Sequence, residues 1–162
     1  MRGAILLRLV VPLLFLQLFT NTEAVAQSET HDFITYDTVL HLGYSNAYWV
    51  MRITRPRNMF TAGHPDTASR PVFINMNGIG EVGSNANLTA NYGPHYWLNH
   101  GWDGGIQLGN GKHYPIIISV QWFQAWPSPY DVHWVIDHIL NTYHVKKNSV
   151  HLCGLSMGAM AW

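Results

Sequence analysis

Alternation of hydrophobic and polar side chains predicts a β-hairpin in the first third of the chain. From Phe33 to Leu42 the even-numbered positions form one face, the period-two pattern of a strand. A second alternating run extends from Ala47 to Ile53, and the intervening Gly-Tyr-Ser-Asn at 43–46 supplies turn residues. Residues 55–70 are polar and contain proline and glycine, so we expect a surface loop there.

Three short runs of almost uniformly hydrophobic residues follow at 72–76, 114–120 and 150–155. Runs of this length without alternation are typical of strands that are covered on both faces, as in a parallel sheet. We therefore expect these three segments to form the parallel part of a sheet.

Helical patterns separate these three runs. Between the second and third, Ser128 and Pro129 are typical N-cap and first-turn residues. A weaker helical region spans 85–101; Gly93-Pro94 divides it and Gly101 ends it. Alternating strands and helices predict an α/β fold with a mostly parallel sheet behind the antiparallel hairpin. The helix after Pro129 has one apolar stripe, formed by Val132, Val135, Ile136, Ile139, Leu140 and Tyr143.

The first 26 residues have the pattern of a secretory signal peptide. Arg2 precedes an apolar run, and Ala24-Val25-Ala26 provides a cleavage site. A membrane anchor is the alternative, but Pro12 and Gln17 leave less than the roughly 20 apolar residues of a span. We expect cleavage after Ala26, no stable membrane anchor, a secreted or periplasmic protein, and one domain in residues 27–162.

The charge balance excludes one class of partner. Lys plus Arg and Asp plus Glu each number 9 among 162 residues, so there is no excess positive charge to drive nucleic-acid binding.

The single Cys153 excludes an internal disulfide framework, and its strand position favours a small buried hydrophobe. His133 and His138 are five residues apart and do not share a helix face, so no zinc site or cofactor is indicated.

The most informative motif is Gly154-x-Ser156-x-Gly158, which follows the third hydrophobic run and precedes small helix-forming residues. A sharp strand-to-helix turn at such a motif holds the serine in a strained conformation and exposes its hydroxyl. The N–H of Met157, at the start of the helix, would then point at a substrate oxyanion. Alone the motif is weak, because an ordinary Gly-rich turn can contain it.

A glycine-rich turn after the first hydrophobic run strengthens this interpretation. Asn77-Gly78-Ile79-Gly80 lies at the carboxyl end of a predicted parallel strand, the edge where such sheets bind ligands. Its backbone N–H groups, that of Ile79 first and Gly80 next, could complete an oxyanion hole. The alternative is a dinucleotide fingerprint, since the glycines at 78, 80 and 83 also spell G-x-G-x-x-G, with Asp103 at the required distance.

With these two motifs the chain resembles the amino-terminal half of an α/β-hydrolase-fold serine esterase, over about Phe33 to Trp162. It is most similar to secreted bacterial feruloyl-esterase-like and polyhydroxybutyrate-depolymerase-like proteins. Members usually carry His-Gly where this chain has Asn77-Gly78, a change that leaves the backbone donor in place. The resemblance implies that Ser156 is the nucleophile, with Met157 and Ile79 lining the oxyanion hole.

In this fold the acid and the histidine of the triad follow the serine in the chain. The sequence ends six residues after Ser156, so we expect a truncated domain that is inactive alone. We expect the family activity to be hydrolysis of small-molecule or polymeric carboxylic esters. A serine peptidase of the same fold and a non-catalytic carbohydrate-binding module are the alternatives. Trp122 and Trp126 could form an aromatic wall for a sugar or aryl ester, or could simply pack in the core.

Overall fold

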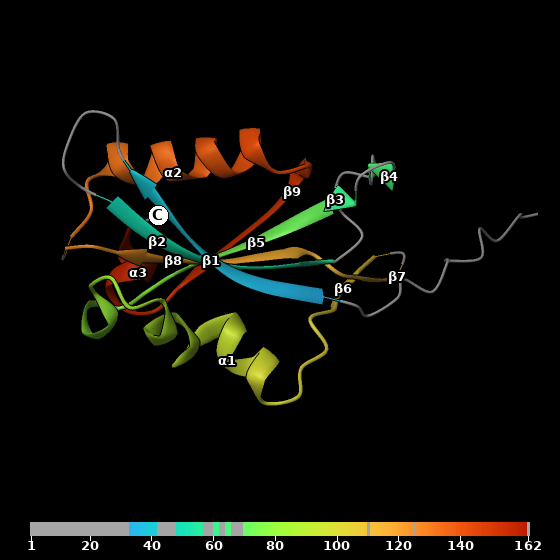
Figure 1. The fold of residues 1–162 in the computed structure, drawn as a ribbon, viewed down its shortest axis with the longest axis horizontal. Helices are drawn as coiled ribbons and strands as arrows, with labels where there is room; N and C mark the ends of the chain where they lie inside the picture. The colour runs from blue at the N-terminus through green and yellow to red at the C-terminus, as the bar shows by residue number, and fades with distance from the viewer. Residues whose placement is uncertain are drawn as a thin grey trace, which may run out of the picture.

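The computed structural model of the protein describes residues 33–41, 48–56, 60–61, 64–65, 70–109, 111–124 and 126–161. The expected signal peptide at 1–26 and the turn at 43–46 lie outside the described residues. A five-stranded mixed sheet forms the centre, with strand order β1-β2-β8-β5-β9 and helices on both faces (Figure 1).

The expected hairpin is confirmed. β1 (Phe33–His41) pairs antiparallel with β2 (Tyr48–Pro56), with Thr38 opposite Met51. β1 alternates between exposed and half-buried residues because it is the edge strand, whereas β2 is mostly buried because it also pairs with β8. The expected loop after β2 contains a short ladder between β3 (Phe60–Thr61) and β4 (His64–Pro65).

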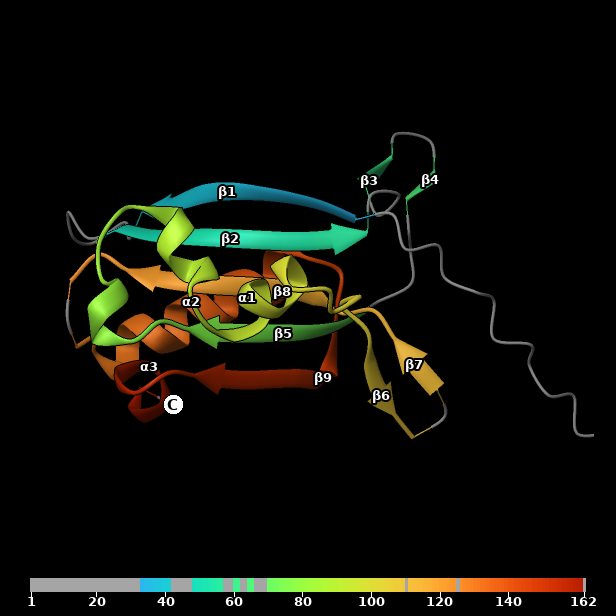
Figure 2. The same ribbon diagram turned by 90° about the horizontal axis from the view of Figure 1, so that it is seen from below.

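The three hydrophobic runs form the parallel part of the sheet, as expected. β5 (Arg70–Met76) lies between β8 (Ile116–Trp122) and β9 (Val145–Gly154) and is parallel to both. All seven residues of β8 are buried, which explains why its sequence does not alternate. The carboxyl ends of the three strands meet at one edge, where the short helix α3 (Met157–Met160) lies (Figure 2).

Helix α2 (Pro129–Thr142) covers one face of the sheet and confirms the predicted start signal. The Ser128 side chain accepts the N–H of Asp131 at 3.2 Å, and the Asp131 carboxylate accepts the N–H of Ser128 at 2.9 Å. The buried residues Val132, Val135 and Ile139 of its apolar stripe belong to the main hydrophobic core.

The opposite face is covered by the 3₁₀ helix η3 (Ala86–Ala90) and by α1 (Gly93–Asn99), the two pieces expected for 85–101 (Figure 1). Gly93 has φ +72°, and a β-carbon there would lie 2.8 Å from Nδ2 of Asn75 on β5. The glycine therefore permits both the turn and the close approach of α1 to the sheet.

A buried polar contact fixes α1 to the sheet. His95 is 3% exposed; its Nδ1 lies 2.6 Å from the Ser119 hydroxyl and its Nε2 lies 3.1 Å from the Thr54 hydroxyl. Burial, followed by the positive charge of Arg52, lowers the pKa of His95 to about 4. His95 is therefore a neutral, hydrogen-bonded core histidine at physiological pH.

A second small ladder, between β6 (Ile106–Leu108) and β7 (Gly111–His113), was not expected, because strands of three residues are too short to show a period.

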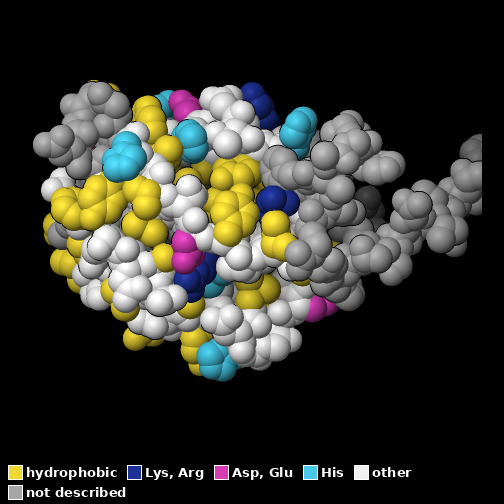
Figure 3. All heavy atoms as spheres, in the orientation of Figure 1, with side chains coloured by type: hydrophobic (Ala, Val, Ile, Leu, Met, Phe, Trp, Pro, Cys, Tyr) yellow, Lys and Arg dark blue, Asp and Glu magenta, His cyan; other side chains and the backbone are white. Residues whose placement is uncertain are grey.

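Figure 3 shows one face of the molecule, on which hydrophobic side chains form separate patches and charged side chains are sparse. None of the described helices is long and apolar enough to cross a membrane.

Candidate active site

Ser156 occupies the sharp turn between β9 and α3. Its backbone has φ 50° and ψ −110°, and it is exposed. Among the described residues only Trp126 shares with it a positive φ in a residue other than glycine. This conformation costs about 1–2 kcal/mol for a residue with a β-carbon, so it persists only where the surrounding structure enforces it.

The two glycines of the motif are required by close packing of this turn. A β-carbon on Gly154 would lie 2.6 Å from the backbone nitrogen of Ala159, and one on Gly158 would lie 2.7 Å from the carbonyl oxygen of Asn77. The N–H of Leu155 also donates to the carbonyl of Met76 at 3.1 Å. Glycine at both positions therefore lets α3 fold back against β9 and the end of β5.

The N–H of Met157 is a candidate donor beside the serine. It belongs to the first residue of α3, where a helix offers no internal acceptor. No hydrogen bond among the described residues uses it, whereas the next three N–H groups donate to Leu155 or Ser156. This N–H can therefore donate to an oxygen atom of a bound ligand.

The glycine-rich turn lies against the serine turn. A β-carbon on Gly78 would be 3.3 Å from Cδ2 of Leu155, the residue before Ser156. Ile79 begins the 3₁₀ helix η2 (Ile79–Glu81) and is 54% exposed. Its N–H, like that of Gly80, takes part in no hydrogen bond among the described residues. The structure thus brings the two predicted donor segments together.

Two side chains that the sequence did not point to hold this turn in place. Oδ1 of Asn77 accepts the N–H of Trp122 at 2.9 Å, and its Nδ2 donates to the carbonyl of Gly78 at 2.7 Å. Oε2 of Glu81 accepts the N–H of Gly78 at 3.0 Å. The spacing of Gly78 and Glu81, a cap and an acid three residues later, is the signal that could have revealed this contact.

The two tryptophans expected near the substrate have different environments. Trp122 is fully buried, with its ring centroid 3.4 Å from that of Trp49, so it packs in the core and offers no surface to a ligand. Trp126 is 60% exposed, has φ 59°, and donates its N–H to the sulfur of Met157 at 3.2 Å. Of the two, Trp126 lies beside the serine turn.

The dinucleotide alternative is not supported by the position of Asp103. This fingerprint requires an acid at the end of the second parallel strand, which is β8, to hold a ribose. Asp103 instead lies before β6, where it pairs with Lys112 and accepts the N–H of Gly105 at 3.1 Å.

Cys153 has an environment that makes it a poor nucleophile. Its thiol donates to Oδ1 of Asn75 at 3.1 Å, and burial raises its pKa to about 11. His133 pairs with Asp137 along α2, and no group of three metal-ligating side chains occurs among the described residues.

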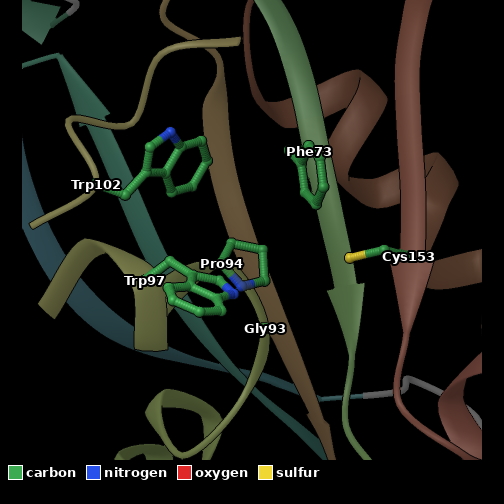
Figure 4. A pocket seen from close by; sticks show the side chains of 6 residues that line it. All are labelled: Phe73, Gly93, Pro94, Trp97, Trp102 and Cys153. Carbon is green, nitrogen blue, oxygen red and sulfur yellow. The ribbon is translucent and has the colours of Figure 1, made fainter. Parts of the chain in front are cut away.

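A cavity of about 490 Å³, whose lining does not include Ser156, lies on the sheet face that α1 covers (Figure 4). Side chains from β5 and β9 face side chains from α1 and the following loop across it. Its lining is almost entirely apolar and consists of Phe73, Gly93, Pro94, Trp97, Trp102 and Cys153.

Comparisons with known proteins point to esterase structures. No protein-family model matches the chain, and no curated protein sequence matches it. A solved ferulic acid esterase is similar over 80% of this chain and 51% of its own, with 13% identity and a TM-score of 0.53. A thermostable esterase is similar over 78% of this chain and 35% of its own, with 18% identity and a TM-score of 0.47. The chain spans about half or less of these two structures. It shares the α/β fold of the ferulic acid esterase.

Proposed function

We propose that the chain is part of a serine hydrolase that cleaves carboxylic esters through an acyl-enzyme on Ser156. The observation that carries the proposal is the strained, exposed Ser156 next to the unpaired N–H of Met157, with the turn of Ile79 packed against the same segment. The likeness to a ferulic acid esterase supports the fold on which this geometry depends.

In the proposed reaction, Oγ of Ser156 attacks the acyl carbon while its proton passes to a general base. The carbonyl electron pair moves to oxygen, and the N–H groups of Met157 and Ile79 hold the resulting oxyanion. Collapse of this intermediate expels the alcohol, which takes up the proton. Water then attacks the acyl-enzyme, releasing the carboxylic acid and restoring the hydroxyl. Removal of one such donor costs about 3–4 kcal/mol of transition-state stabilisation in known cases.

We propose that the base and its orienting acid come from outside the described residues. No histidine among the described residues makes a hydrogen bond to Ser156. Trp126, exposed and tied to Met157, would contact an aromatic or sugar group of the substrate.

Labelling with a fluorophosphonate probe tests the proposal in the full-length product of the gene. Wild-type protein should be labelled and should hydrolyse an activated ester, whereas Ser156→Ala should do neither. Ser149→Ala removes a serine from the same strand, β9, and should behave like wild type. An unlabelled wild-type protein contradicts the proposal and favours the carbohydrate-binding module. Cleavage of a peptide amide in preference to the ester favours the peptidase.

We also propose that residues 1–26 direct secretion. The amino terminus of the protein recovered from the medium or periplasm should begin at Gln27. An intact Met1 in that fraction would contradict this proposal.

A further inference from the structure

We infer that Glu81 is a positioning residue for the oxyanion hole: its carboxyl group holds the N–H of Gly78 and keeps that of Ile79 free to face the substrate. The inference rests on the proposed function, because Ile79 is a donor only in that reaction. Glu81 itself touches no substrate in this scheme.

The backbone of the turn is held by few bonds of its own. Helix η2 has only two backbone hydrogen bonds. The N–H of Glu81 donates to the carbonyl of Gly78 at 3.1 Å, and the N–H of Val82 donates to the carbonyl of Ile79 at 3.4 Å. The second is close to the limit of a hydrogen bond. Gly78 and Gly80 also leave the turn conformationally permissive.

Backbone bonds to β8 anchor the two ends of the turn, from Asn77 to Val120 at 3.2 Å and from Gly83 to Trp122 at 2.8 Å. Side-chain contacts hold the backbone between these two anchors.

Glu81 makes one of these contacts from inside the protein. Oε2 of its side chain accepts the N–H of Gly78 at 3.0 Å, so this N–H is not available to a substrate oxyanion. Its backbone carbonyl accepts Nε2 of Gln121 on β8 at 2.7 Å. One residue thus joins the first N–H of the turn to the central strand, and the two N–H groups between them stay unpaired.

The energetics argue against a purely stabilising role for this carboxyl group. Glu81 is only 5% exposed, and its Oε1 has no hydrogen-bond partner among the described residues. Burial raises the pKa of Glu81 more than the bond from Gly78 lowers it. Burying an ionisable group with one oxygen unpaired carries a desolvation cost that offsets the gain from its bond to Gly78. The contact with Gly78 is what an apolar residue could not provide.

Three variants of the full-length protein separate positioning from stability. Glu81→Gln keeps an oxygen for the N–H of Gly78, whereas Glu81→Met keeps the size but accepts no hydrogen bond. We expect the Met variant to lose about 10- to 100-fold in kcat with KM within threefold, with a fall in Tm no larger than that of Asp131→Leu, and the kcat of the Gln variant to stay within threefold of wild type. Asp131→Leu removes the equivalent capping contact of α2 and should lower Tm without changing kcat.

The outcomes are distinguishable from failure of the proposed function. A Met variant with wild-type kcat, or a Gln variant as impaired as the Met variant, overturns the inference while leaving Ser156 as the nucleophile. A wild-type protein with no turnover overturns the proposed function instead. In that case amide hydrogen exchange decides: faster exchange at Gly78 in the Met variant than in wild type supports the role of Glu81, and unchanged exchange overturns it.

Discussion

Gly158 faces Asn77 so closely that a β-carbon on the glycine would lie 2.7 Å from the Asn77 carbonyl oxygen. This contact joins the first turn of α3 to the end of β5, where the glycine-rich turn begins. The conformation of Ser156 is therefore set by packing between two segments that are about 80 residues apart in the sequence, and not by the motif alone.

Gly158→Ala should destabilise the protein. The obstructing atoms are backbone, which cannot rotate away, so overpacking should lower the free energy of unfolding by about 1–3 kcal/mol. This loss should exceed the roughly 1 kcal/mol that alanine gains over glycine in a helix. Urea denaturation of the 162-residue chain measures the difference. Gly80→Ala is the control, because a β-carbon on Gly80 would meet no atom within 4 Å, and it should change stability by less than about 0.5 kcal/mol.

His95 should make stability depend on pH between about 6.5 and 4. Its folded pKa is about 4 against 6.5 in the unfolded chain, so the unfolded state binds the extra proton in this interval. Stability should therefore fall as pH is lowered from 6.5 to 4, by about 3 kcal/mol. Chemical denaturation at pH 7, 5.5 and 4 measures this loss.

The neutral variant His95→Gln isolates this contribution. It should be less stable than wild type at pH 7, because the bonds to Ser119 and Thr54 change, but should lose less stability on acidification. Equal pH dependence in the two proteins would show that another group is responsible.

Cys153 should react slowly with alkylating agents. A pKa of about 11 instead of 9.0 leaves about 100-fold less thiolate at pH 8, and the thiolate is the reactive form. Mass spectrometry of the folded chain with iodoacetamide should show at least this retardation relative to the same chain in urea. Equal rates with and without urea would contradict the buried, hydrogen-bonded thiol.

The elements that follow from sequence are those whose signal is local. The stripe from Val132 to Ile139 and the Ser128 cap predict α2, and the unbroken apolar runs predict the parallel strands. The strained turn at Ser156 was predicted because glycines flank it at fixed spacing. Each of these features is specified by neighbouring residues, so a single sequence suffices to find it.

The features that could not be predicted depend on long-range contacts. Trp122 and Trp126 are four residues apart and chemically alike, and only the end of β8 decides that one is in the core and the other at the surface. Asn77 contacts the backbone of a residue 45 positions away. Contacts between residues so far apart in the chain do not produce a periodic pattern of hydrophobic and polar residues, so the sequence alone does not predict them.

Trp126 provides a test of strain in the loop that follows β8. Its φ of 59° is unfavourable for any side chain but not for glycine. Trp126→Ala and Trp126→Gly both remove the exposed ring, and both keep the N–H that donates to the sulfur of Met157. The Gly variant should nevertheless be more stable than the Ala variant by about 1 kcal/mol, although glycine usually destabilises folded chains. Thermal and urea denaturation of the pair measure this order. If the Ala variant is the more stable one, the loop is not held in the left-handed conformation at this position.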